Sequence, residues 1–204
     1  MKLTPKTSAF TLIELLVVIS IIAILATLVT PAIQGGMLQG QLAQTLNNAR
    51  QLQIATQMMS ADTLQAGSGI AWTSTNDGNG QEQAASVSDY FTALTTNGYV
   101  TKNELKKLLT APSKGPGTAE PSASNSCFTF FWVKESSPSD QPLMVTANWG
   151  AGGLNASTQP YGSKAFVVYN KGGGGAMSRK LDMATSTNMF PTDTSLGYTT
   201  QTLN

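Results

Sequence analysis

The chain has 204 residues, with 12 Lys and Arg against 11 Asp and Glu, and only 11% of its residues are charged. Soluble globular domains carry about 25% charged residues, so this chain is unusually poor in charge. Without His there is no Ser-His-Asp triad and no His-containing zinc site. A lone cysteine, Cys127, excludes an internal disulfide and a cysteine metal cluster. The near-zero net charge gives no basic surface for nucleic acid. We therefore expect no enzyme, no cofactor and no nucleic-acid partner.

The segment from Leu12 to Ile33 is almost entirely aliphatic. At ~1.5 Å per residue, a helix of ~22 residues extends about 33 Å, against a hydrocarbon core of about 30 Å. Lys2 and Lys6 precede the segment, and the next basic residue is Arg50. The positive-inside rule therefore places the N-terminus in the cytoplasm and the bulk of the chain across the membrane. The sequence predicts a single membrane-spanning helix.

A cleaved secretory signal is the alternative interpretation of this segment. Thr30-Pro31-Ala32 would then be the cleavage site. Against it, the apolar run is longer than the ~7–15 residues of such signals. It also holds a carboxylate, Glu14, in its first turn.

Glu14 has two explanations. A carboxylate inside a membrane is costly, by about 2.5–3.5 kcal/mol at mid-depth, so such residues usually have a partner. Alternatively, an acidic residue at a helix N-terminus is favoured by the helix dipole and extends toward the lipid headgroups. The physical argument alone leaves both open.

Residues 8–19, SAFTLIELLVVI, resemble the N-terminal signature of type IV prepilins and type II secretion pseudopilins. That signature is a short basic leader, a small residue, Phe, three further residues, Glu and an apolar helix. Pro31 also lies where the family commonly has a helix-loosening proline. One position departs: Ala9 stands where the family prefers Gly.

The resemblance implies that a prepilin peptidase cuts between Ala9 and Phe10 and that the new amine of Phe10 is N-methylated. It further implies that Glu14 pairs with the Phe10 amine of a neighbouring subunit in a filament. An amine and a carboxylate that are each costly in lipid become compatible as a pair. The implied partners are other pilin or pseudopilin subunits, the inner-membrane assembly platform and membrane lipid.

Beyond the apolar segment the chain stays compatible with a helix to about Asp62. Apolar residues recur along it at intervals of three, four or seven, which predicts one buried stripe on an amphipathic helix: Leu38, Leu42, Ala49, Leu52, Ala55 and Met59. The opposite face is polar but almost uncharged. Pro31, Gly35 and Gly36, together with Gly40, are expected to weaken the helix and form a joint; ordinary small-residue packing is the alternative.

Residues 65–88 are rich in Gly, Ser, Thr, Asn and Gln and predict a long loop. Asp77 and Asn79 within it are weak calcium candidates, because their spacing does not match an EF-hand. Two short helices follow, at residues 89–96 and 102–109. Thr101 and Glu104 have the spacing of a capping box at the start of the second.

Four β-rich runs lie in the C-terminal half: residues 127–134, 142–149, 164–170 and 176–183. They predict two hairpins and a small antiparallel sheet of about four strands. Phe128 and Phe130 alternate with Cys127 and Phe131, so both faces of the first strand carry apolar side chains. One face is expected to pack on the amphipathic helix. The predicted fold is α+β and pilin-like.

Combining the residue patterns with the resemblance, we expect a leader at residues 1–9, a membrane and filament-core helix at 10–33, its amphipathic continuation at 34–62, and a periplasmic or extracellular head at 63–204. The expected function is a structural subunit of a type II secretion pseudopilus or a type IV pilus-like filament, anchored by a single pass in the bacterial inner membrane. Many pili carry a C-terminal Cys pair, so the lone Cys127 favours the pseudopilus. The alternative is a membrane-anchored periplasmic binding module that does not polymerise.

Overall fold

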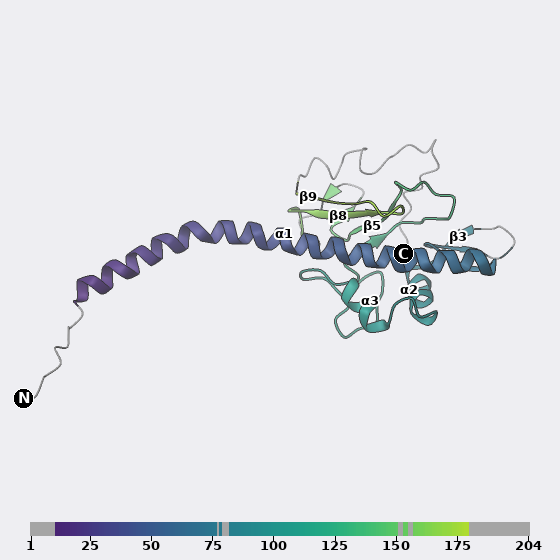
Figure 1. Ribbon diagram of the computed structural model, residues 1–204, viewed down its shortest axis with the longest axis horizontal. Helices are drawn as coiled ribbons and strands as arrows, with labels where there is room; N and C mark the ends of the chain where they lie inside the picture. Colours follow the sequence, from purple (N-terminus) through teal and green to yellow (C-terminus); the bar gives the residue numbers. More distant parts are fainter. Residues whose placement is uncertain (1–10, 77, 79–81, 151–152, 155–156, 180–204) are drawn as a thin grey trace, which may run out of the picture. The chain divides into compact units, whose positions relative to one another are not determined.

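In the computed structural model, the residues described are 11–76, 78, 82–150, 153–154 and 157–179. The chain divides into two compact units, Met1–Gly40 and Gln41–Asn204. Helix α1 (Leu12–Ala66) contributes to both. We call the second unit the head (Figure 1).

The head part of α1 is amphipathic, as its sequence predicts. Leu42, Ala49, Leu52, Ala55 and Met59 are all buried. They recur at helical spacing, so they share one face, which turns toward the rest of the head. The helix continues past the expected end near Asp62 to Ala66, where the N–H of Gly67 bonds to the carbonyl of Thr63. Gly67 has φ of +79°, the left-handed conformation that commonly ends a helix.

The prediction of a long loop at residues 65–88 is wrong. This segment forms a three-stranded antiparallel meander of β1 (Gly69–Ala71), β2 (Ser74–Asn76) and β3 (Glu82–Ala84). Its strands are only three residues long, so they are too short to show the apolar alternation by which a strand is recognised in sequence. Long-range hydrogen bonds hold it, including one from Oγ1 of Thr73 to the carbonyl of Phe131 at 2.7 Å.

The two predicted short helices are present as α2 (Val87–Thr96) and α3 (Lys102–Leu108). Ser86 caps the first, with its hydroxyl accepting from the N–H of Asp89. The capping box at the second is confirmed: Oγ1 of Thr101 accepts from the N–H of Glu104, whose carboxylate accepts from the N–H of Thr101.

The predicted four-stranded antiparallel sheet is confirmed. Its order is β4 (Phe128–Phe130), β5 (Pro142–Thr146), β8 (Phe166–Asn170) and β9 (Gly175–Ser178). Phe130 lies opposite Met144, and Val168 lies opposite both Val145 and Ala176. A small hairpin of β6 (Trp149–Gly150) and β7 (Gly153–Leu154) sits between β5 and β8 in the chain.

Within the head, the sheet lies on one side of α1, and α2 and α3 lie on the other (Figure 1). The main apolar cluster joins these layers: Met59 of α1, Tyr90 and Phe91 of α2, and Phe128 and Phe130 of β4. Phe91 and Phe130 make an edge-to-face contact with centroids 5.4 Å apart. The expected packing of the sheet on the amphipathic helix is therefore confirmed.

A second, smaller cluster occupies the other face of the sheet. Phe131, Val145, Phe166 and Val168 are buried there against Trp149 and Leu154, so the β6–β7 hairpin helps to cover this face. Cys127 is free and buried, and its burial raises the pKa of the thiol well above its usual range. It is a small core residue, not a reactive thiol.

Candidate functional site

The apolar part of α1 has its side chains exposed. Large apolar residues from Leu12 to Ile33 are about half exposed or more, with Leu12 at 81% and Leu28 at 69%. Among the described residues, α1 is the one helix long and apolar enough to cross a membrane, with a mean hydropathy of 2.9 over its most apolar stretch and none of that stretch buried. Soluble monomers rarely expose so large an apolar surface. A hydrocarbon layer or other apolar helices would cover it.

Polar side chains in this part of α1 are satisfied by the helix itself. The hydroxyls of Ser20, Thr27 and Thr30 donate to the carbonyls of Leu16, Ile24 and Ala26 at 2.7 to 2.8 Å. Such internal hydrogen bonds remove the cost of carrying a hydroxyl into lipid. These residues therefore leave the apolar character of the helix surface intact.

Glu14 lies in the first turn of α1 and is held by Thr11. Its Oε2 accepts from the backbone N–H of Thr11 at 2.8 Å and from the Thr11 hydroxyl at 2.7 Å. The N–H of Glu14 points back to the same hydroxyl at 3.3 Å. This is a capping box with the geometry found at Thr101 and Glu104. Within a single chain, Glu14 is thus a helix-capping residue, and its other oxygen, Oε1, accepts none of these bonds.

Several of the expected site residues lie outside the described part of the chain. These are Ala9 and Phe10 at the expected cleavage position, and Asp77 and Asn79, the calcium candidates. Cleavage, methylation and calcium binding therefore stay predictions. Over the described residues, no group of three or more Cys, Asp or Glu is placed to hold a metal ion.

The expected joint at Pro31, Gly35 and Gly36 lies within the bounds of α1. A Cβ built on Gly35 or on Gly36 would meet nothing within 4 Å. In the single chain, no close packing partner requires a glycine at either position. The joint stays a prediction.

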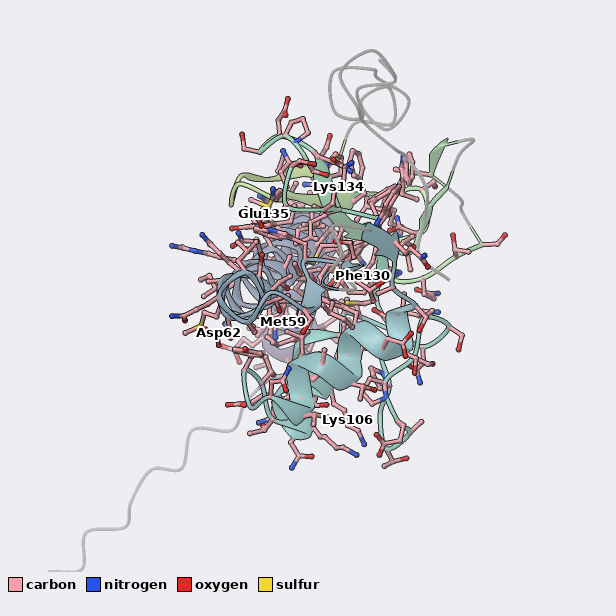
Figure 2. The ribbon with its side chains drawn as sticks, turned by 90° about the vertical axis from the view of Figure 1, so that its right-hand side faces the viewer. Met59, Asp62, Lys106, Phe130, Lys134 and Glu135 are labelled. Atoms are coloured by element: carbon pink, nitrogen blue, oxygen red, sulfur yellow. The ribbon has the colours of Figure 1, made fainter. Side chains whose placement is uncertain are left out.

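The head carries an open groove of about 540 Å³ between α1 and α3. Gln44, Asn48 and Gln51 line it from α1, and Lys106 and Lys107 line it from α3. Asn48 bridges the two helices, with its amide 3.4 Å from the carbonyl of Lys107 and 3.3 Å from that of Thr110. Figure 2 shows Lys106 on the outer side of α3. The groove is open, and among the described residues that line it no nucleophile is paired to a base.

A polar cluster ties the far end of the head part of α1 to the loop after β4. Glu135 accepts from Ser60 at 2.9 Å and from the indole of Trp72 at 2.7 Å. The ammonium of Lys171 donates to the carbonyls of Glu135 and Ser137 and lies 5.0 Å from the centre of the Trp72 ring. These hydrogen bonds join α1 to the loop after β4. They pair the polar groups of the cluster with one another, so the cluster has a structural role.

Comparison with known proteins bears on the N-terminal part of the chain. A family model described as the prokaryotic N-terminal methylation motif matches residues 4–30. The chain carries a type IV pilin-type signature. The matched stretch contains Thr11 and Glu14 and most of the exposed apolar part of α1. No curated protein and no solved structure matches the chain.

The pilin-type motif has direct consequences for the chain. It implies processing by a prepilin peptidase and assembly with pilin-like subunits. Together with the long apolar helix, it indicates that the protein is anchored in a membrane. The long helix α1 and the small antiparallel sheets together give the α+β architecture expected of a pilin-like fold.

Sequence reasoning missed two features of this helix. The first is Thr11 as the partner of Glu14, although the Thr-x-x-Glu spacing is the same one recognised at Thr101. The second is on the head part of α1, where the exposed carboxylate of Asp62 accepts a hydrogen bond from the hydroxyl of Tyr99 at 2.6 Å.

Proposed function

We propose that the protein is a structural subunit of a type II secretion pseudopilus or a type IV pilus-like filament. It is made as a precursor in the bacterial inner membrane, with its N-terminus in the cytoplasm and its head in the periplasm or beyond. Prepilin peptidase removes residues 1–9, Phe10 is N-methylated, and assembly occurs through the first part of α1. Its role is assembly in support of secretion, not catalysis.

One observation carries this proposal: the methylation motif at residues 4–30 runs directly into a helix whose apolar side chains are exposed all around. A membrane anchor alone needs the apolar helix. The motif adds a processing signal and a carboxylate at the start of that helix. Since a lone carboxylate is disfavoured in lipid, Glu14 is best accommodated when a second subunit brings a positive amine to it.

The test is recovery of the protein in filaments. The chain is produced in a bacterium that has a prepilin peptidase and an assembly platform, and surface filaments are sheared off, pelleted and imaged by electron microscopy. We expect the processed chain in the pelleted filaments. A fully processed chain that stays in the membrane fraction as a monomer would favour the non-polymerising binding module.

A further inference from the structure

One end of the head is joined directly to the apolar part of α1. The head begins at Gln41, and residues 34–40 separate it from Ile33, the last residue of the apolar segment. A helix over these residues extends about 12 Å at ~1.5 Å per residue. The headgroup layer of a bilayer extends about 5–7 Å beyond the hydrocarbon core on each side. The end of the head at Gln41, which we call the anchor end, is therefore held within a short distance of lipid phosphates.

Three lysines lie at the anchor end on the α3 side of α1. The hydroxyl of Tyr99, just before α3, bonds to Asp62 near the far end of α1. The carbonyl of Thr110, just after α3, lies 3.3 Å from the amide nitrogen of Asn48. The chain through α3 therefore runs back along α1 toward the anchor end (Figure 1). The last turn of α3 and the loop after it carry the cations Lys106, Lys107 and Lys114.

The sheet side of α1 adds a fourth cation at this end. The hydroxyl of Tyr161 bonds to the carbonyl of Gln41 at 3.1 Å and lies 2.6 Å from the hydroxyl of Thr45. The backbone N–H of Lys164 bonds to the carbonyl of Tyr161 in the same turn. Because Lys164 is exposed, its ammonium faces the solvent at the anchor end.

Strand β9 leads to a fifth cation. After Lys164, β8 runs along α1 away from the anchor end, because the carbonyl of Lys171, just past β8, accepts a hydrogen bond from Nε2 of Gln53 at 2.8 Å. β9 pairs antiparallel with β8, so it runs back toward the anchor end. Arg179, the residue after β9, is exposed there. We call the five cations at this end the basic group: Lys106, Lys107, Lys114, Lys164 and Arg179.

Most acidic side chains in the described part of the head lie far from the anchor end or are already engaged. Asp62 and Glu135 accept hydrogen bonds beside the last turns of α1. Glu120 is paired with Lys102 at 3.7 Å. Glu104, which lies close to the basic group in the chain, is held by the capping box of α3. The anchor end therefore carries a net positive charge, and the far end of the head carries most of the negative charge.

We propose that the anchor end of the head docks on the phosphate groups of anionic lipids in the membrane that holds the unassembled subunit. The basic group then meets the negative lipid surface, whose field extends about 8–10 Å into solution at ~0.1–0.15 M salt. The basic group lies on both sides of α1 (Figure 1), so a head that stands on its anchor end presents all of these cations to the surface at once. The membrane at this end rests on the proposed function.

The arrangement of the basic group favours a lipid surface over a small anion. The ammonium groups of Lys106 and Lys114 donate to the carbonyls of Thr118 at 3.1 Å and Ser124 at 2.6 Å, which fixes their positions. The members of the group belong to separate elements on the two sides of α1, so one small anion contacts few of them. A surface meets them all, and the covalent anchor keeps the effective concentration of that surface high.

The first test measures how close the anchor end lies to lipid headgroups in the full-length chain. Ser163→Cys, beside Lys164, and Ser136→Cys, beside Glu135 at the far end, are each labelled with a fluorophore. Cys127 is buried and gives the background. The chain is reconstituted in vesicles of phosphatidylcholine, with or without phosphatidylglycerol, that contain a lipid with a quencher on its headgroup.

We expect quenching at position 163 to be at least twofold stronger in the vesicles with phosphatidylglycerol. It should fall to the phosphatidylcholine value at high salt, because salt shortens the range of the field. Quenching at position 136 should be the same in both kinds of vesicle. Equal quenching at position 163 in both kinds would overturn the proposal. An equal increase at both positions would show that the head lies on its side, and it would overturn end-on docking.

The second test changes the charge of the basic group on both sides of α1. Lys107→Glu/Arg179→Glu should at least halve the phosphatidylglycerol-dependent quenching at position 163, whereas Lys107→Arg/Arg179→Lys should retain it. Lys134→Glu is the matched control at the far end and should leave the quenching unchanged. If the double reversal kept the full dependence on phosphatidylglycerol, the basic group would not be the contact.

Two further conditions separate the lipid surface from other anionic partners. Inorganic phosphate should release the head no more than chloride does at the same ionic strength; a stronger release would show a site for free phosphate and overturn the proposal. Quenching should not depend on the number of chains per vesicle. A dependence on chain number would show that a second copy, not lipid, meets the basic group.

The two proposals fail in distinguishable ways. If the chain floats with the vesicles and is recovered in filaments, but quenching does not respond to lipid charge, the filament proposal stands and lipid docking fails. If the chain does not float with vesicles, the membrane anchor fails, and the proposed function fails with it.

Discussion

The carboxylate of Glu14 accepts two hydrogen bonds from Thr11, one from its N–H at 2.8 Å and one from its hydroxyl at 2.7 Å. In the single chain, before any second subunit is present, Glu14 therefore caps the start of α1. Its two roles, capping α1 and offering a negative charge, can be separated, because Gln satisfies a capping box as well as Glu.

The first prediction uses this difference. Glu14→Gln should leave the helix start and membrane insertion unchanged, while filament recovery falls by at least tenfold because the charge is lost. Glu14→Ala should lose both the cap and assembly. The measurement is the ratio of chain in sheared filaments to chain in membranes. If Glu14→Gln assembled as well as wild type, charge pairing at this position would be ruled out.

The second prediction concerns Gly175 at the start of β9. A Cβ there would lie 2.4 Å from Cδ2 of the Tyr169 ring and 2.7 Å from Cδ1 of Leu46, so Gly175→Ala forces the Tyr169 ring and the Leu46 side chain to move. We expect a loss of about 1–3 kcal/mol in the free energy of unfolding, measured by denaturant titration of the detergent-solubilised chain. Gly174→Ala is the matched control, since its Cβ would meet only Nδ2 of Asn170 at 4.0 Å. Equal losses in the two variants would show that close packing is not the cause.

The third prediction concerns the buried contact between α1 and α2. The hydroxyl oxygens of Thr56 and Tyr90 are 2.6 Å apart, and both side chains are fully buried. Thr56→Val leaves the Tyr90 hydroxyl buried without its partner and should cost about 1–3 kcal/mol. Adding Tyr90→Phe removes the orphaned hydroxyl and should recover part of that loss. A double variant less stable than Thr56→Val alone would contradict this interpretation.

The fourth prediction is a pH dependence from the capping box of α3. Hydrogen bonds from the hydroxyl and the N–H of Thr101 lower the pKa of the Glu104 carboxyl below its usual value. A carboxyl whose pKa is lower in the folded state stabilises the fold above the unfolded-state pKa, near 4.3, and loses that contribution as pH falls through the folded-state pKa. Glu104→Gln should therefore show a smaller loss of stability than wild type between about pH 5 and pH 2. Parallel stability curves for the two proteins would contradict it.

Much of this fold can be predicted from local patterns of residue type and spacing in the sequence. The stripe from Leu42 to Met59 and the Thr101 capping box depend on spacing within one helix. Strands β4, β5 and β8 are rich in apolar, aromatic or β-branched residues. The β1–β3 meander depends instead on distant partners, as in the bond from Thr73 to Phe131. Strands of three residues are too short to show a periodic pattern in the sequence.

The candidate site likewise has one part that could be predicted from the sequence and another that could not. Glu14 was predictable because it stands alone in an apolar segment and fits a family signature. The bond from Tyr99 to Asp62 joins α1 to the connection between α2 and α3, and spacing within α1 does not reveal it. Bonds such as Trp72 to Glu135 join residues far apart in the chain and could not be derived from spacing.

The most direct measurement of the central proposal is the mass and N-terminal sequence of the protein purified from filaments or membranes of its own host. Processing as a pilin-type subunit predicts a mature chain that begins at Phe10 and carries one methyl group on its α-amine. A chain that begins at Met1 would contradict prepilin processing, and a chain that begins at Gln34 would show that residues 1–33 are an ordinary secretory signal.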